Sequence, residues 1–154
     1  MDILVTDRQR HLPSAARILK AMTRRVVEFE DPAAGEVDVI LSDDALLAEL
    51  NQRFRNLPRA TDVLSFPAED PGPARHLGEV VMSAQRAIVQ APRYGHSVAE
   101  EVARLLVHGL LHLLGYEHDT SSGRRAMRRA ERTHLERLRP WTAKLAARYR
   151  SVEP

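Results

Sequence analysis

The most constraining feature of this 154-residue sequence is a set of three closely spaced histidines. His108 and His112 are four residues apart, so in an α-helix they lie on one face, one turn from each other. His118 follows six residues later, beyond Gly115. Glycine readily adopts the left-handed conformation that ends many helices. Gly115 therefore predicts a helix end and a turn that brings His118 back toward the first two imidazoles.

Three imidazoles that converge on one point form a three-ligand metal site with an open fourth position, the arrangement of catalytic zinc. The alternative is three unrelated histidines in an apolar helix. The sequence contains no cysteine, so any metal must be bound by His, Asp or Glu. Other divalent transition metals such as Ni²⁺ or Cu²⁺ also bind imidazole, so zinc is predicted from geometry and availability, not from affinity.

The segment that carries the first two histidines has the pattern of a long core helix. Ser97 and Glu100 match a capping box, in which side chains satisfy free backbone N–H groups at the helix start. An apolar stripe follows, and on a helical wheel His108 and His112 lie at its margin. We therefore expect both histidines to line the floor of a cleft. The stripe consists of Val102, Leu105, Leu106, Gly109 and Leu113.

Zinc held by three neutral imidazoles acidifies a bound water and polarises a phosphoryl or carbonyl oxygen, so the site predicts hydrolysis. The spacing His-x-x-x-His-x-x-Gly-x-x-His also occurs in metzincin proteases. Proteases with this type of zinc helix carry a glutamate directly after the first histidine as general base, whereas this sequence has Gly109. Glycine cannot transfer a proton, so a metzincin-like hydrolase is the weaker alternative.

Alternating short strands and helices predict one compact α+β, α/β-like domain over residues 1–154. We expect a small mixed sheet of about four strands with surrounding helices and the metal site at the end of the long core helix. The proline at position 67 places the third strand near an edge. The predicted strands are 3–6, 37–42, 63–66 and 78–83. The other predicted helices are 13–30, 43–54, 84–91 and one that follows a turn at 119–123 and ends near 138.

Several finer expectations follow from the same patterns. Phe29 and Phe54 continue the apolar spacing of the first two helices, so both are predicted to face the core. Glu101 lies two turns before His108 and is expected to be a solvated carboxylate, with an outer contact to the metal site as the alternative. Residues 55–60 are predicted to form a loop.

Positive charge is concentrated near the C-terminal end, although the net charge is only +2. Residues 1–120 contain 13 Lys and Arg against 18 Asp and Glu, whereas residues 121–154 contain 10 against 3. The arginine-rich helix predicted after the turn at 119–123 either contacts an RNA backbone along its length or is a solvated face. The arginines concerned are Arg124, Arg125, Arg128, Arg129 and Arg132. The sequence shows neither a secretory signal nor an apolar run long enough for a membrane span, so a cytoplasmic location is expected.

Four segments in order along most of the chain carry further motifs, namely Leu50–Arg55, Thr61–Pro67, Leu77–Val80 and His108–His118. Together they resemble the motifs of the YbeY family of bacterial metal-dependent endoribonucleases. The sequence departs conservatively from the family pattern at Phe54, Glu79 and Glu117. The two glutamates replace aspartates, so a carboxylate that orients a ligand histidine would be one methylene longer here.

This resemblance implies zinc bound by His108, His112 and His118, and cleavage of single-stranded RNA. It implies a role in maturing the 3′ end of small-subunit (16S) ribosomal RNA and in late ribosome quality control. The implied partners are ribosomal RNA and the small ribosomal subunit, with a ribosomal protein and an assembly GTPase as further contacts. Arg55 is the implied catalytic residue, because a guanidinium grips phosphate with two hydrogen bonds and stays charged. The alternative for Arg55 is a surface residue packed on its own helix end.

Some features of the reaction stay open at this stage. Gly109 is excluded as general base, and either water or the ribose 2′-hydroxyl is the nucleophile. Asp62 is expected to cap a turn and Ser65 to bond backbone, with a hydrogen bond from Ser65 into the cleft as the alternative. The second functional hypothesis is a non-catalytic ribosome assembly factor whose metal is structural.

Overall fold

The computed structural model describes residues 1–57, 59 and 61–152. It contains the small α+β fold with a four-stranded mixed sheet that the sequence predicts. The strands are β1 (Asp2–Asp7), β2 (Glu36–Ser42), β3 (Val63–Pro67) and β4 (His76–Ser83). The helices are α1 (Ala16–Glu30), α2 (Asp44–Arg55), α3 (Ala84–Arg93), α4 (Val98–Leu113), α5 (Ser121–Arg137) and α6 (Arg139–Arg148). Among these residues, no helix is long and apolar enough to cross a bilayer.

The sheet has the strand order β1-β2-β4-β3. β1, β2 and β4 are parallel, and β3 runs antiparallel to β4 at the edge. This agrees with the edge position that Pro67 predicts for β3, since proline cannot donate a ladder hydrogen bond.

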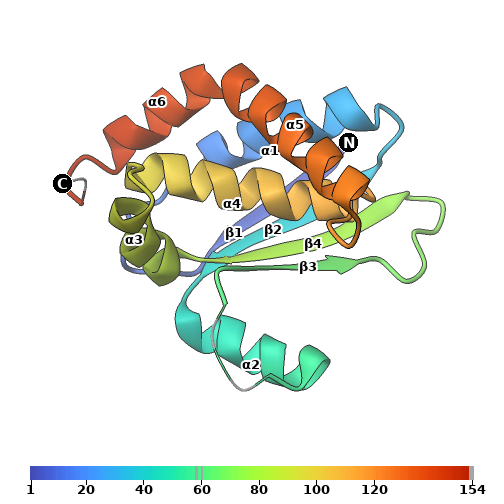
Figure 1. The fold of residues 1–154 in the computed structure, drawn as a ribbon, viewed down its shortest axis with the longest axis horizontal. Helices are drawn as coiled ribbons and strands as arrows, with labels where there is room; N and C mark the ends of the chain where they lie inside the picture. Colours follow the sequence, from blue (N-terminus) through green and yellow to red (C-terminus); the bar gives the residue numbers. More distant parts are fainter. Residues whose placement is uncertain (58, 60, 153–154) are drawn as a thin grey trace.

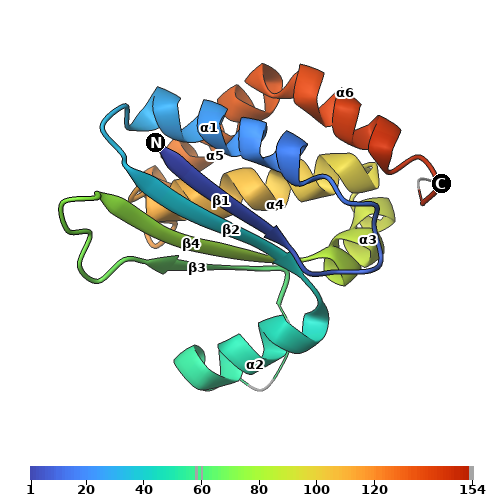
Figure 2. The same cartoon turned by 180° about the vertical axis from the view of Figure 1, so that it is seen from behind.

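The two faces of the sheet are covered unequally. α4 lies across one face with α1, α5 and α6 around it, and α2 lies alone on the other face (Figures 1 and 2). The main apolar core, which includes Leu105, Leu106 and Leu110, forms on the α4 side. A second small cluster of Leu47, Leu64 and Val81 forms beneath α2. α4 is therefore the central helix of the molecule, as the sequence predicts.

The two predicted core phenylalanines lie at the surface instead, so that prediction was wrong. Phe29 is 54% exposed and Phe54 is 60% exposed. Each belongs to the last turn of its helix. Phe29 is covered by the guanidinium of Arg137, 4.0 Å from its ring centre, and Phe54 packs against Phe66 with ring centres 5.3 Å apart. These contacts cover part of each ring, so neither ring needs to enter the core.

Two predicted helix starts also shift. The first helix begins at Ala16, three residues after Pro13, and α5 begins at Ser121, inside the predicted turn. The cause is the cap of α5, because Thr120 accepts a hydrogen bond from the backbone N–H of Gly123 and so starts the helix early. In the predicted loop 55–60, positions 58 and 60 lie outside the described residues.

Candidate metal centre

α4 ends where the sequence predicts, and its end redirects the chain. Its start is fixed by the predicted capping box between Ser97 and Glu100. At its end Gly115 has φ +96°, a left-handed conformation that favours glycine. The backbone N–H of Tyr116 then donates to the carbonyl of Leu111 at 3.0 Å, which closes the helix end. The chain turns back, and His118 comes to lie beside α4.

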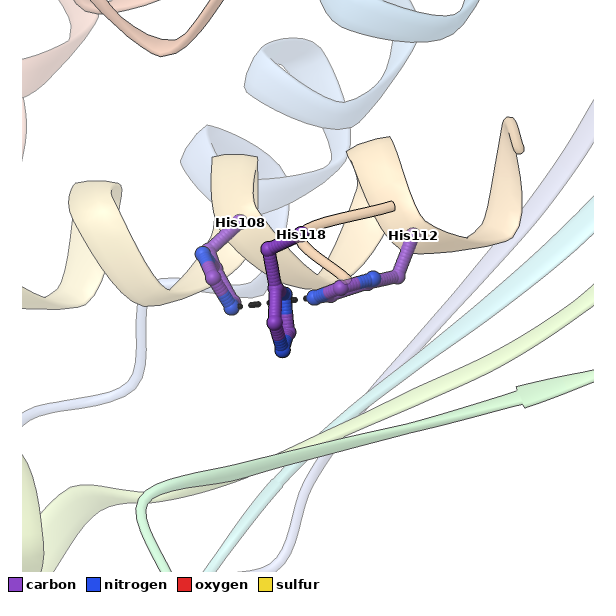
Figure 3. A group of neighbouring side chains, drawn as sticks. All are labelled: His108, His112 and His118. Carbon is purple, nitrogen blue, oxygen red and sulfur yellow. Dashed lines mark hydrogen bonds between the residues drawn. The ribbon is translucent and has the colours of Figure 1, made fainter. Parts of the chain in front are cut away.

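The three predicted ligands meet at one point. His108 and His112 project from α4 and His118 from the turn after it, with the rings directed toward one another (Figure 3). One ligand nitrogen from each of the three lies within 4.8 Å of the others. The Nε2 atoms of His108 and His112 are 3.1 Å apart. Two nitrogen ligands of tetrahedral zinc lie about 3.3 Å apart, so this pair fits a zinc ion.

The far nitrogens of two of the rings are occupied. Nδ1 of His108 lies 2.8 Å from Oε1 of Glu131, and Nδ1 of His112 lies 3.2 Å from the carbonyl of Tyr116. A carboxylate and a carbonyl only accept hydrogen bonds, so both Nδ1 atoms donate. Each Nε2 therefore presents a lone pair to the centre, which is the tautomer that a metal ligand needs.

The electrostatic environment favours neutral imidazole at His112. Burial lowers the pKa of His112, and the neighbouring His108 and His118 lower it further. A proton on any ring would compete with a metal for the same lone pair. The centre is thus arranged to keep His112 unprotonated and available as a ligand.

Gly109 sets how closely α4 approaches the sheet. A Cβ atom at this position would lie 2.6 Å from Cγ1 of Val80 and 3.1 Å from Cγ2 of Val63. The hydroxyl of Ser65 donates to the carbonyl of Gly109 at 2.8 Å, so Ser65 bonds backbone as predicted. A glutamate in place of Gly109 would have no room. The packing around position 109 therefore excludes a glutamate general base there, in addition to the absence of a glutamate from the sequence.

The three histidines form one wall of a cleft of about 490 Å³. Arg55 lies on the cleft at the last residue of α2, where Asn56 ends the helix in the left-handed conformation. Its side chain is exposed and makes no hydrogen bond or ion pair with the residues that the structure describes. The guanidinium is therefore available to a bound anion. The remaining lining residues include Asp62, Val63, Ser65, Pro67 and Glu117.

Glu101 is fully buried, so the prediction of a solvated carboxylate was wrong. Its two oxygens accept hydrogen bonds from Arg104 at 2.8 and 2.7 Å, which raises the pKa of Arg104, and Gln90 donates to it at 2.8 Å. Pairing of this kind offsets the cost of burying the charge. The Asp62 carboxylate accepts from Gln90 at 3.3 Å and lies 3.8 Å from Arg104. Asp62 is thus held by this network beside the cleft and does not cap a turn.

Glu131 is the residue of the centre that the sequence reasoning missed. It lies 23 positions after His108, on a different helix. One signal was present, because Glu131 lies at helical spacing with Met127, His134 and Leu138, which are all buried. An acid on a buried stripe needs a partner there. Glu117 and Glu79 are both exposed, and neither makes a hydrogen bond or ion pair to a ligand histidine among the described residues.

The chain is similar to known endoribonucleases over most of its length. The family model described as "Endoribonuclease YbeY" matches residues 4–139. A Moorella thermoacetica protein with that description is 39% identical over 137 residues, which cover 80% of this chain and 88% of the relative. A Nautilia profundicola protein with the same description is 47% identical over 103 residues, covering 67% and 72%. The solution structure of TM1509 from Thermotoga maritima superposes with a TM-score of 0.65 at 25% identity, covering 92% and 93% of the two chains.

Proposed function

The chain belongs to the YbeY family of endoribonucleases, and we propose that it cleaves single-stranded RNA at the three-histidine centre with one zinc ion. The observation that carries this proposal is the convergence of three imidazoles in one cleft with the Arg55 guanidinium, which has no partner among the described residues. We also propose that residues 1–154 act as one YbeY-like domain. The donor set, three neutral nitrogens with an open side, is typical of catalytic rather than structural zinc.

Each residue of the centre has a definite part in this proposal. His108, His112 and His118 would hold the ion, while Glu131 and the Tyr116 carbonyl keep two of the rings in the required orientation. When bound, zinc supplies Lewis acidity that polarises a phosphoryl oxygen and makes water acidic near neutral pH. Arg55 would bind the scissile phosphate and stabilise the charge that develops on it.

The nucleophile is either water or the ribose 2′-hydroxyl, and the products distinguish them. Attack by the neighbouring hydroxyl leaves a 2′,3′-cyclic phosphate, whereas attack by water leaves a linear phosphate. Mass spectrometry of the fragments therefore identifies the route. Family membership supports ribosomal RNA as the substrate, with maturation of the 16S 3′ end in the cytoplasm as the proposed task. Contacts with a small-subunit ribosomal protein and an assembly GTPase belong to the same proposal.

The test is cleavage of a single-stranded RNA and its double-stranded counterpart by highly purified protein. Wild type, His112→Ala and Arg55→Ala are compared, with metal content and melting temperature measured on each. We expect wild type alone to cleave, and only the single strand. Arg55→Ala should retain its metal and its stability, because the Arg55 side chain is exposed and contacts no partner in the part of the chain that the structure describes.

Two other outcomes would change the interpretation. Equal cleavage by all three proteins would reveal a contaminating nuclease. A pure wild type that binds metal and RNA without cleaving either strand would instead favour a ribosome assembly factor with a structural metal.

A further inference from the structure

The exposed side of α5 carries positive charge that the proposed reaction does not use. Arg125, Arg128, Arg129 and Arg132 are exposed, and their guanidinium groups form no ion pair or hydrogen bond within residues 1–57, 59 and 61–152. Arg124 is also exposed, and it donates to the carbonyl of His118 at 3.1 Å. α5 thus places unneutralised cations next to the turn that supplies a ligand histidine.

These arginines form two rows, one of which lies closer to the metal-facing side of α5 than the other. Glu131 marks the side of α5 that faces the metal centre, because it contacts His108. At about 100° per residue, the three members of one row lie about 20°, 60° and 100° from Glu131. The members of the other row lie about 120–160° away. We call these the inner row (Arg124, Arg128 and Arg132) and the outer row (Arg125 and Arg129).

The inner row runs along α5 from the metal cleft, where Arg124 contacts His118, to a separate groove between α4, α5 and α6 that Arg132 lines. Arg132 lines a second cleft of about 390 Å³ between α4, α5 and α6, together with Arg104. Arg104 precedes His108 by one helical turn, about 6 Å along the axis, on the same face of α4. Arg104 also lies 3.8 Å from Asp62, which lines the metal cleft. One face of α4 therefore leads from the second cleft to the histidines, with the inner row beside it.

The charge in this groove is only partly neutralised. Arg104 is paired with the buried Glu101, and Arg139 at the far end is 3.2 Å from Glu136. Arg128 and Arg132 are the members of the inner row that have no partner within the described residues. They are the cations that an added anion would meet between the metal cleft and the second cleft.

We infer that the inner row binds the phosphates of the RNA strand that leaves the metal cleft, so that the substrate follows the groove between α4 and α5. This inference rests on the proposed function, because it extends the same substrate beyond the same cleft. Arginine binds phosphate through two parallel hydrogen bonds. The only aromatic ring in α5 is that of His134, which is buried, so the helix offers no base-stacking surface. The contact is therefore to the backbone and independent of base sequence.

The outer row provides a control that removes the same charge. We compare Arg128→Gln/Arg132→Gln with Arg125→Gln/Arg129→Gln, measuring binding and cleavage of single-stranded RNAs of about 4 and about 20 nucleotides. The inner-row variant should bind the long RNA on the order of tenfold more weakly, with a slope of log Kd against log salt reduced by about 1.4. It should also lose the preference of wild type for cleaving the long RNA over the short one. The outer-row variant should keep wild-type values.

The outcomes separate this inference from the proposed function. If wild type cleaves RNA and the two variants behave alike, the assignment of the inner row is wrong while the proposed function stands. If wild type cleaves neither RNA, the proposed function is wrong. RNA binding by the two double variants then decides by itself whether the inner row binds RNA. All four side chains are exposed, so equal melting temperatures and metal contents are expected and confirm that the variants are folded.

Discussion

At the scale of single residues, the proposed metal centre depends on groups that orient the three histidines as well as on the histidines themselves. Glu131 is mostly buried, with 21% of its side chain exposed, and its carboxylate fixes Nδ1 of His108 at 2.8 Å. Without this partner the His108 ring is free to rotate or to take the other tautomer. Outer partners of this kind contribute about 10–100-fold to metal affinity.

We therefore predict that Glu131→Gln lowers zinc affinity about 10–100-fold without unfolding the protein. Competition against a chromophoric chelator measures the affinity directly. Glu136→Gln, on the same helix but paired with Arg139 at the surface, is the matched control and should keep wild-type affinity. Equal affinity of both variants would show that Glu131 does not support the metal.

The lowered pKa of His112 gives a second prediction, on the pH dependence of the metal-free protein. Between the folded and unfolded pKa values, the unfolded chain binds more protons than the folded one. Stability therefore rises as pH increases toward the ordinary histidine pKa of about 6.5 and is lost as pH falls below it.

Denaturant unfolding of metal-free wild type and His112→Asn across this range tests the prediction. The other six histidines are common to both proteins, so the difference between the two curves reports His112. The difference should shrink as the pH falls. Parallel curves would mean that His112 has the same pKa in the folded and unfolded chain.

At the scale of elements, Gly109 determines how α4 packs on the edge of the sheet. Adding a Cβ brings it to 2.6 Å from Cγ1 of Val80, so either the helix or the strand must move. We predict that Gly109→Ala lowers the free energy of unfolding by about 1–3 kcal/mol, despite the better helix propensity of alanine. In a Val80→Ala background the closest atom is absent, and the penalty should be smaller. A double-mutant cycle with no coupling between the two positions would contradict this packing argument.

The elements themselves were largely predictable, because their signals are local. The capping box at Ser97 and the left-handed Gly115 fixed α4 from the sequence, and Pro67 marked β3 as an edge strand. The prediction of which side chains of α1 and α2 face the core was less accurate near the ends of these helices. Phe29 and Phe54 obey helical spacing, but periodicity does not reveal where the covering layer stops.

The parts of the centre that were not predicted come from contacts between distant elements. The ligand triad lies within eleven consecutive residues, so helix geometry and one turn place it. Glu131 reaches His108 from a separate helix, and Gln90 reaches Glu101 only once α3 and α4 have packed. Neither of these two contacts is visible in local spacing, whereas Arg104 lies three residues after Glu101 on the same helix and could have been named as its partner. An acid on an apolar stripe indicated that such a partner exists, but not which residue it is.

At the scale of the whole molecule, the metal centre lies where several separate segments meet. The turn after α4 is fastened to α1, because the hydroxyl of Tyr116 donates to Glu30 at 2.7 Å. Glu30 also lies 2.9 Å from Nε2 of the buried His134, which belongs to α5. The ligand turn, α1 and α5 are thus joined through one carboxylate. A metal bound at the turn should therefore stabilise the packing of these segments together.

We predict that zinc raises the melting temperature of the folded protein. A ligand that binds only the folded state at 100 times its Kd contributes about 2.7 kcal/mol, which corresponds to a shift of about 5–11 °C for a chain of this size. His118→Ala is the sharpest control. Its side chain is exposed, so the metal-free variant should melt close to wild type, while the shift with zinc should be lost. The shift in wild type should also fall as the pH drops below the histidine range, because protons compete for the ligand nitrogens. An unchanged zinc shift in His118→Ala would mean that the metal is held without the third histidine, and the three-ligand centre would have to be abandoned.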